Sequence, residues 1–110
     1  ILGEMLERHD FVFFEYIQTD MVGHSRDFER AEMILSQIIE MFDALLGQVN
    51  LSQHTVILVS DHGNFEDLST NTHTRNNVPT IAWGDGALDF IRSIQSLTDI
   101  TPGILAILGK

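Results

Sequence analysis

The stretch that decides the fold runs from Thr55 to Asn64 and reads Thr-Val-Ile-Leu-Val-Ser-Asp-His-Gly-Asn. Up to Val59 it contains only β-branched and aliphatic residues, which predicts a buried strand over 55–60. A carboxylate and an imidazole, Asp61 and His62, follow directly. In open α/β sheets ligands bind beyond the carboxyl ends of the strands, so this stretch predicts both a sheet and a site at its edge.

The residues before this stretch predict a helix preceded by another strand. The segment 11–17 is rich in aromatic and β-branched residues, as in a strand covered on both faces. After a polar loop, apolar residues recur at steps of three and four and indicate a helix that starts near Phe28 and ends near Gly47. They are Ile34, Leu35, Ile38, Ile39, Phe42, Leu45, Leu46 and Val49. A strand, a crossover helix and a strand predict a parallel pair, hence an α/β fold with a mixed, mostly parallel sheet and flanking helices.

The residues after this stretch predict a long loop, a third strand and a final helix. Residues 61–77 are polar and show no helical period, so strand 78–83 should run antiparallel or lie at an edge, which suits Pro79. Residues 85–97 fit a short helix and a strand equally well. Asp99, Pro102 and Gly109 resemble an N-cap, an early proline and a C-terminal stop around a short helix.

Composition limits the class of protein. The chain has 110 residues, enough for one domain or part of one, with 16 acidic and 6 basic residues and a formal charge of −10. Such a charge disfavours nucleic acid and anionic membranes as partners. Without cysteine, any metal must bind oxygen and imidazole. The apolar runs are far shorter than the roughly 20 residues of a membrane span, so we expect a cytoplasmic protein. The chain begins at Ile1 without an initiator methionine, which suggests an excised piece of a longer protein.

Potential metal ligands lie in three places that the topology should bring together. Asp20 and His24 follow the first predicted strand, Asp61 and His62 follow the second, and His73 precedes the third. If the third strand is antiparallel, its beginning lies at the edge where the other two end. These residue types suit Zn²⁺ or Mn²⁺, and their number exceeds the usual three protein ligands of a catalytic zinc, which favours two ions about 3.5–4 Å apart.

Each of these elements also has a simpler interpretation. Asp20 and His24 could form a surface pair or a helix cap, Asp61–Asn64 could be a plain turn, and His73 could be a hydrogen-bonded loop histidine. Their joint position at one sheet edge favours the metal site. Gly23 and Gly63 should permit tight backbone turns beside the ligands. The neighbouring acids Glu66 and Asp67 could support the ligands from outside the coordination sphere, but we expect them to be exposed loop residues.

The polar groups resemble three motifs of the metalloenzyme branch of the alkaline phosphatase superfamily. The likeness is greatest to the cofactor-independent phosphoglycerate mutases and smaller to the phosphopentomutases. The motifs are Asp20-Met21-Val22-Gly23-His24, Ser60-Asp61-His62-Gly63-Asn64 and His73-Thr74-Arg75-Asn76-Asn77-Val78-Pro79. The resemblance implies that Asp20, His24 and His73 hold one divalent ion, and that Asp61 and His62 hold another.

The same resemblance implies that residues 1–110 are the C-terminal portion of a catalytic domain. In that family another metal-binding Asp and the Ser or Thr nucleophile lie upstream, and no segment here matches them. The implied function is two-metal phosphoryl transfer on a phosphorylated small molecule, by a phosphomutase or a phosphatase or phosphodiesterase, in partnership with the rest of the domain. A catalytically incomplete metal-binding module is the alternative, and a sulfatase or phosphonate hydrolase fits the motifs less well.

Overall fold

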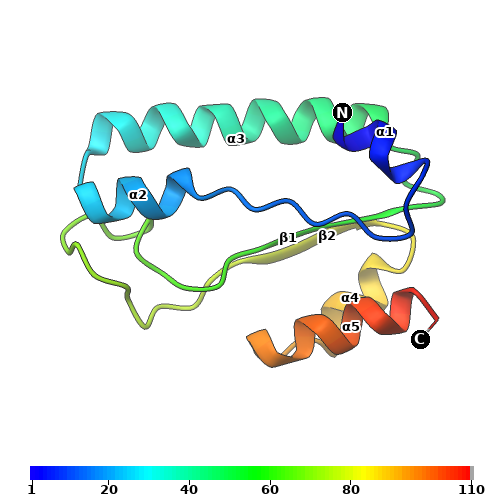
Figure 1. Ribbon diagram of the computed structural model, residues 1–110. Coiled ribbons are helices and arrows are strands. Elements are labelled where there is room, and N and C mark those ends of the chain that lie inside the picture. Colours follow the sequence, from blue (N-terminus) through cyan, green and yellow to red (C-terminus); the bar gives the residue numbers. More distant parts are fainter. Residues whose placement is uncertain (110) are drawn as a thin grey trace.

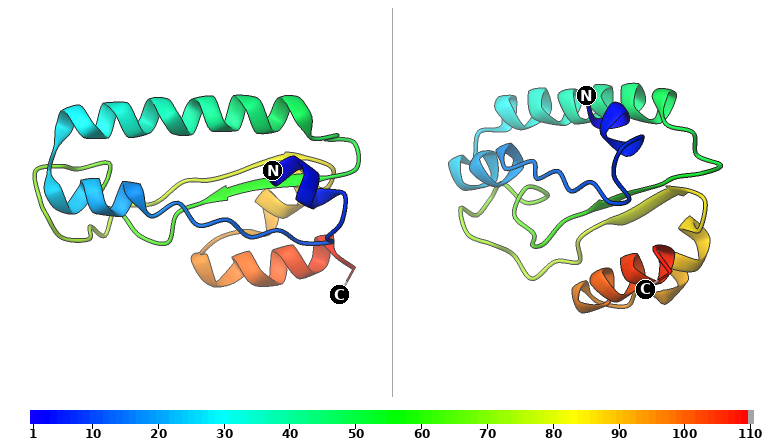
Figure 2. Two further views of the ribbon diagram at one scale, coloured as in Figure 1. Left: turned by 45° about the horizontal axis from the view of Figure 1, so that its top comes forward. Right: turned by 45° about the vertical axis from the view of Figure 1, so that its right-hand side comes forward.

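The computed structural model describes residues 1–109 and contains both helices and strands, as the sequence predicts. The elements in chain order are α1 (Leu2–Leu6), α2 (Gln18–Ser25), α3 (Phe28–Gln48), β1 (Thr55–Val59), β2 (Thr80–Gly84), α4 (Ala87–Ser93), the 3-10 helix η1 (Leu97–Asp99) and α5 (Ile100–Ile107). Figure 1 shows β1 and β2 between α3 on one side and α4 with α5 on the other. The two turned views in Figure 2 keep this three-layer order.

The two strands pair antiparallel, with Thr55 opposite Gly84 and Leu58 opposite Ile81. This confirms the predicted orientation of the strand after the long loop. Within residues 1–109 the sheet has only these two strands, so it contains no parallel pair. The α/β class is therefore supported by the mixture of elements, whereas the mostly parallel sheet is not seen in this part of the chain.

The segment 11–17 is not a strand, which corrects the prediction. Residues 11–16 form an extended trace that pairs with no strand among the described residues, and Figures 1 and 2 show this trace connecting α1 to α2. The side chains of Phe11, Phe13 and Phe14 are 52%, 76% and 53% exposed. Apolar composition favours extended backbone, but a strand also requires neighbouring backbone to pair with, and none of residues 1–109 supplies it.

Residues 18–25, which we expected in a polar loop, form helix α2 instead. Asp20 lies in its first turn and His24 in its last, which are the ends where acidic and basic groups are favourable. Arg26 ends the helix in the left-handed conformation, with φ of 59°. The Asp-x-x-x-His spacing is thus one helical turn, which places both side chains on one face.

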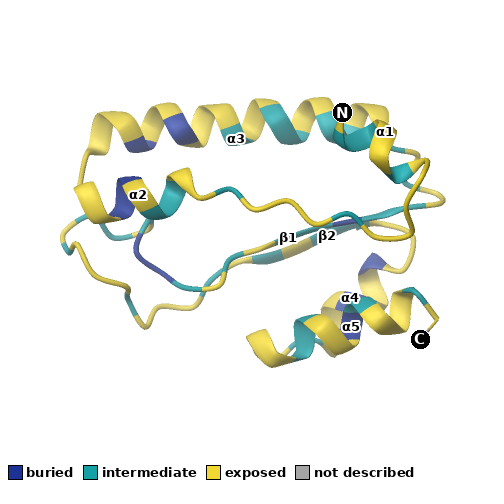
Figure 3. Cartoon of the chain, in the orientation of Figure 1, coloured by how far each residue is buried: buried dark blue, intermediate teal, exposed yellow. Residues whose placement is uncertain are grey.

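The helix predicted to start near Phe28 is confirmed as α3. Asp27 caps it by accepting a hydrogen bond from the backbone N–H of Arg30 at 3.0 Å, and Gly47 lies one residue before its last residue. Ala31 and Ile34 of α3 pack with Val22 of α2 in the main apolar cluster. Figure 3 shows buried segments of α3 and of α2 where the two helices lie side by side. This packing fixes α2, and therefore Asp20 and His24, against the long helix.

The C-terminal region resolves the segment that the sequence left open. Residues 87–93 form α4, whose Phe90 is buried, and Gly103 of α5 packs so closely that an added Cβ would lie 2.8 Å from Phe90 Cε2. Asp99 precedes α5 as predicted, but its carboxylate accepts from the backbone of Gln95 and Ser96 rather than capping α5. None of the helices described is long and apolar enough to cross a membrane.

Candidate metal centre

Helix α2 presents Asp20 and His24 as a pair. Asp20 Oδ1 lies 3.3 Å from His24 Nε2. The other ring nitrogen, His24 Nδ1, lies 2.7 Å from the carbonyl oxygen of Asn71. A carbonyl only accepts hydrogen bonds, so Nδ1 carries the proton, and in the neutral ring Nε2 keeps its lone pair toward Asp20. Backbone carbonyls commonly orient metal-binding histidines in this way.

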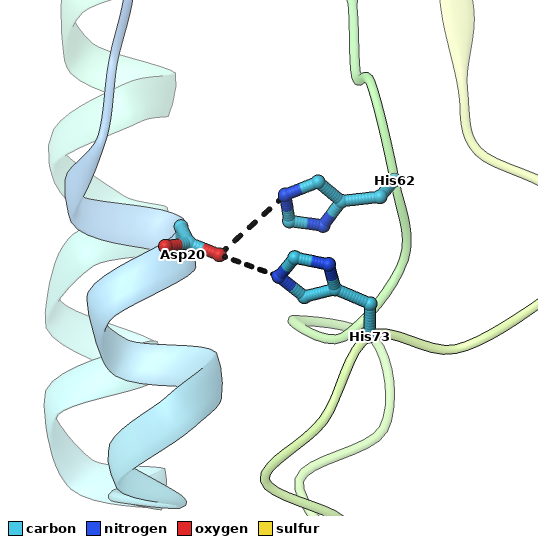
Figure 4. A group of neighbouring side chains, drawn as sticks. All are labelled: Asp20, His62 and His73. Carbon is cyan, nitrogen blue, oxygen red and sulfur yellow. Dashed lines mark ion pairs between the residues drawn. The ribbon is translucent and has the colours of Figure 1, made fainter.

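His62 and His73 approach the same Asp20 oxygen from the loop that follows β1. Their Nε2 atoms lie 3.5 Å and 3.4 Å from Asp20 Oδ1. Figure 4 shows Asp20 projecting from α2 toward both rings, which come from the loop after β1. The two imidazoles stack with centroids 3.6 Å apart and an interplanar angle of 15°. Side chains from α2 and from both parts of the loop therefore lie close together.

The geometry around Asp20 Oδ1 fits a divalent ion. This oxygen is buried and has no hydrogen-bond partner, a costly state for a carboxylate. It can form a trio with His62 and His73 in which all the potential ligand atoms lie within 4.8 Å of one another. Around a tetrahedral zinc with bonds of about 2.0–2.1 Å, ligand atoms are separated by about 3.3–3.4 Å. The Asp20–imidazole distances match this edge length.

Asp61 is the most loosely placed of the candidate ligands. Its side chain is 87% exposed, and its Oδ1 lies 3.7 Å from His62 Nε2. The side chains of Asp20 and His62 are 34% and 29% exposed. The structure thus brings Asp20, His62 and His73 together, joins His24 to them through Asp20, and leaves Asp61 at the solvent side.

Gly23 and Gly63 do not form the turns that the sequence predicts. Neither has a positive φ, and both instead allow close approach. A Cβ on Gly23 would lie 2.6 Å from Oδ1 of Asn64, which is 2% exposed. Asn64 also donates to the carbonyl of Thr70 at 3.1 Å. Because Gly23 has no side chain, α2 can approach the loop closely enough for the Asp20 carboxylate to lie beside the rings of His62 and His73.

Glu66 makes contacts that its sequence context does not predict. It is exposed as expected, yet its carboxylate accepts hydrogen bonds from the Thr74 hydroxyl, the Asn64 backbone N–H and the Asn76 amide. These bonds, led by that from Thr74, hold the pKa of Glu66 down at about 2 against its usual 4.5. The only signal in the sequence is the set of hydroxyl and amide residues near His73, which would suit many loops.

Comparison with known proteins identifies the family. The model of the Metalloenzyme superfamily matches residues 1–110, so the chain belongs to this superfamily. The chain is 35% identical to the 2,3-bisphosphoglycerate-independent phosphoglycerate mutase of Haloquadratum walsbyi, in an alignment covering 91% of this chain and 21% of that enzyme. It is 30% identical to the enzyme of the same name from Desulforudis audaxviator, covering 94% of this chain and 22% of that enzyme.

The chain spans about a fifth of the length of these curated relatives. No solved structure matches it significantly. The family match confirms the resemblance on which the ligand set was predicted, whereas the ligand role of each residue stays a prediction.

Proposed function

We propose that the full-length protein is a metal-dependent phosphomutase in which this chain supplies the C-terminal ligands of two divalent ions. The observation that carries the proposal is the approach of three imidazole Nε2 atoms to within 3.5 Å of the unpartnered Asp20 Oδ1. The names of the relatives add the reaction class, because they are phosphoglycerate mutases.

The ligands divide between the ions as the family resemblance implies. Asp20, His24 and His73 would hold one ion, while Asp61 and His62 would begin the site of the other. The contact between His62 Nε2 and Asp20 Oδ1, at 3.5 Å, supports two adjoining sites, as in two-metal centres with ions about 3.5–4 Å apart. Oxygen and imidazole ligands suit Mn²⁺ and Zn²⁺ alike.

The residues of this chain would bind and orient rather than act as a nucleophile. Two bound ions supply charge that activates a hydroxyl nucleophile and stabilises the entering and leaving oxygens of phosphoryl transfer. Asp20 would contribute its Oδ1, which is buried and has no hydrogen-bond partner. Asn71 fixes the ring of His24, and the stacking of His62 on His73 restricts both rings. Such fixed groups reduce the reorganisation required during the reaction.

The partners follow from the same proposal. The substrate would be a phosphorylated small molecule, with phosphoglycerate as the first compound to assay. The rest of the catalytic domain would cover the large apolar side chains that this part of the chain leaves exposed, among them Phe13 at 76% and Phe28 at 67%.

A metal-binding module without catalysis is the second candidate. One observation favours it: Asp20, His62 and His73 form a compact trio, whereas the 87% exposed Asp61 leaves the other site open. On that account the chain binds one ion and transfers no phosphoryl group.

Metal content and activity of the full-length protein test the proposal. We expect two Mn²⁺ or Zn²⁺ per chain and phosphoglycerate mutase activity that a chelator removes and the ion restores. Asp20→Asn should abolish this activity, and Asp43→Asn, on an exposed position of α3, should retain it. One ion without activity would support the binding module, and an active Asp20→Asn protein would refute the ligand assignment.

A further inference from the structure

The loop between His62 and His73 is held closed by one carboxylate. Glu66 Oε2 accepts from the Asn64 backbone N–H at 2.7 Å. Its Oε1 accepts from the Thr74 hydroxyl at 2.5 Å and from the Asn76 side-chain amide at 2.9 Å. Asn64 lies two residues after one histidine, and Thr74 lies directly after the other. The carboxylate therefore links the two ends of the loop that carry the imidazoles.

A backbone bridge lies directly beside this link. Gly63 and Thr74 form an isolated antiparallel bridge, in which the Thr74 N–H donates to the Gly63 carbonyl at 3.0 Å. A Cβ on Gly63 would lie 2.2 Å from Thr74 Oγ1 and 2.7 Å from Glu66 Oε1. The hydroxyl and the carboxylate thus occupy the space that a side chain at 63 would need. We call Glu66, Thr74 and Gly63 the loop clamp.

The loop clamp lies in a segment that has no regular secondary structure to hold it. Residues 61–77 contain neither helix nor strand, yet the rings of His62 and His73 lie 3.6 Å apart and both approach one oxygen of Asp20. Free loop residues lose conformational entropy when they are ordered for binding, and cross-loop hydrogen bonds reduce that cost in advance. Bonds to an ionised acceptor are among the stronger ones available.

We infer that Glu66 is a positioning residue of the metal centre, which sets the spacing of His62 and His73 through the Thr74 hydroxyl and the Asn64 N–H without itself binding the ion. This inference rests on the proposed function, because it takes the two histidines to be metal ligands. On this inference Glu66 positions the two histidines and is not merely a solvated surface acid.

The charge state of Glu66 supports this role. Hydrogen bonds, with that from Thr74 the largest cause, lower the pKa of its carboxyl to about 2. The acceptor is therefore ionised throughout the pH range in which histidines are neutral enough to bind a metal. Protonation would not open the clamp at any pH where the site could be loaded.

Metal affinity of the full-length protein at pH 7.5, measured for Zn²⁺ and Mn²⁺ by chelator competition, tests the inference. Glu66→Gln keeps the size of the side chain but replaces one carboxylate oxygen by an NH₂ group. An NH₂ group cannot accept a hydrogen bond from Asn64, Thr74 or Asn76. We expect affinity to fall about tenfold to a hundredfold, the usual effect of residues that orient ligands. Asp67→Asn is the matched control, because Asp67 accepts only from the backbone N–H and hydroxyl of Ser69, at 3.0 Å and 2.5 Å. It should bind the ions as the unmodified protein does.

Variants of Thr74 separate positioning from a general loss of folding. Thr74→Val should weaken binding, and Thr74→Ser, which keeps the hydroxyl, should restore it. Adding Thr74→Val to Glu66→Gln should weaken binding little further, because both remove the same bond. Thermal melting without metal identifies any variant that fails to fold. If Glu66→Gln fails to fold, the comparison of Thr74→Val with Thr74→Ser tests the inference instead.

The outcomes are distinct. If the unmodified protein binds neither ion, the proposed function fails. If it binds them and Glu66→Gln binds equally tightly, or if Thr74→Val binds as well as Thr74→Ser, Glu66 is not a positioning residue and the inference is overturned while the metal centre stands.

Discussion

Helix α3 and the loop of residues 61–77 are ordered by opposite means. The helix follows from a repeat of apolar residues and a capping aspartate, and it packs through Ala31 and Ile34. The loop has no repeat and is held by side-chain hydrogen bonds centred on Glu66. The comparison shows that the scaffold depends on apolar burial, whereas the spacing of the histidines depends on a few polar contacts. Substitutions in the two regions should therefore have different effects.

The largest effect on stability is expected in the scaffold. Ile34 is 1% exposed and lies in the apolar cluster with Val22 and Ala31. Ile34→Ala should lower the free energy of unfolding by about 2–5 kcal/mol, because it removes buried methyl groups and leaves a cavity. Urea denaturation measures this loss. A change no larger than that of an exposed-site control such as Leu35→Ala, at a side chain 48% exposed, would contradict the packing described here.

A glycine pair tests the contact between scaffold and loop. Gly23→Ala would place a Cβ 2.6 Å from the buried Asn64 Oδ1, whereas Gly47→Ala in α3 meets nothing within 4 Å. We expect Gly23→Ala to destabilise the protein by about 1–3 kcal/mol, as overpacking does, and to weaken metal binding.

Gly47→Ala should instead stabilise α3 by about 0.5–1 kcal/mol, since alanine is the better helix former. Thermal melting and chelator competition on both variants provide the comparison. Equal effects of the two substitutions would show that α2 does not approach the loop as closely as described.

The cap of α3 should matter to stability and little to the metal. Asp27 accepts the N–H of Arg30 at 3.0 Å, and Asp27→Ala should cost about 1 kcal/mol, a typical value for an N-cap. Because the Asp27 carboxylate bonds within the first turn of α3, metal affinity of the folded protein should be unchanged. A clear loss of affinity would mean that the two regions are more strongly coupled than their contacts indicate.

Acid should act on the loop through Glu66. Its folded-state pKa of about 2 lies below the usual 4.5, so its contribution to stability is complete above pH 4.5 and is lost as pH falls toward 2. The difference in unfolding free energy between the metal-free protein and Glu66→Gln should be constant above pH 4.5 and shrink below it. A difference that does not change between pH 5 and pH 3 would contradict this assignment.

The sequence predicts the parts whose pattern is local. The period of α3, the apolar run of β1 and the antiparallel direction of β2 could all be predicted. Three of the five candidate ligands, Asp20, His62 and His73, lie together in the structure, while the ligand roles stay predictions. Residues 11–16 look like a strand, but pairing depends on neighbouring backbone that composition does not encode. Helix α2 is short and weakly patterned, so its polar residues suggested a loop. Glu66 resembles any loop acid until the positions of Thr74 and Asn76 are known.

The most direct test is anomalous diffraction from crystals of the full-length protein grown with Mn²⁺ or Zn²⁺. The account predicts an ion bound to Asp20 Oδ1 and to Nε2 of His24 and His73, at about 2.0–2.2 Å for zinc, with a second ion bound to His62 and Asp61. An anomalous map without a peak beside Asp20, from a protein saturated with metal, would contradict it.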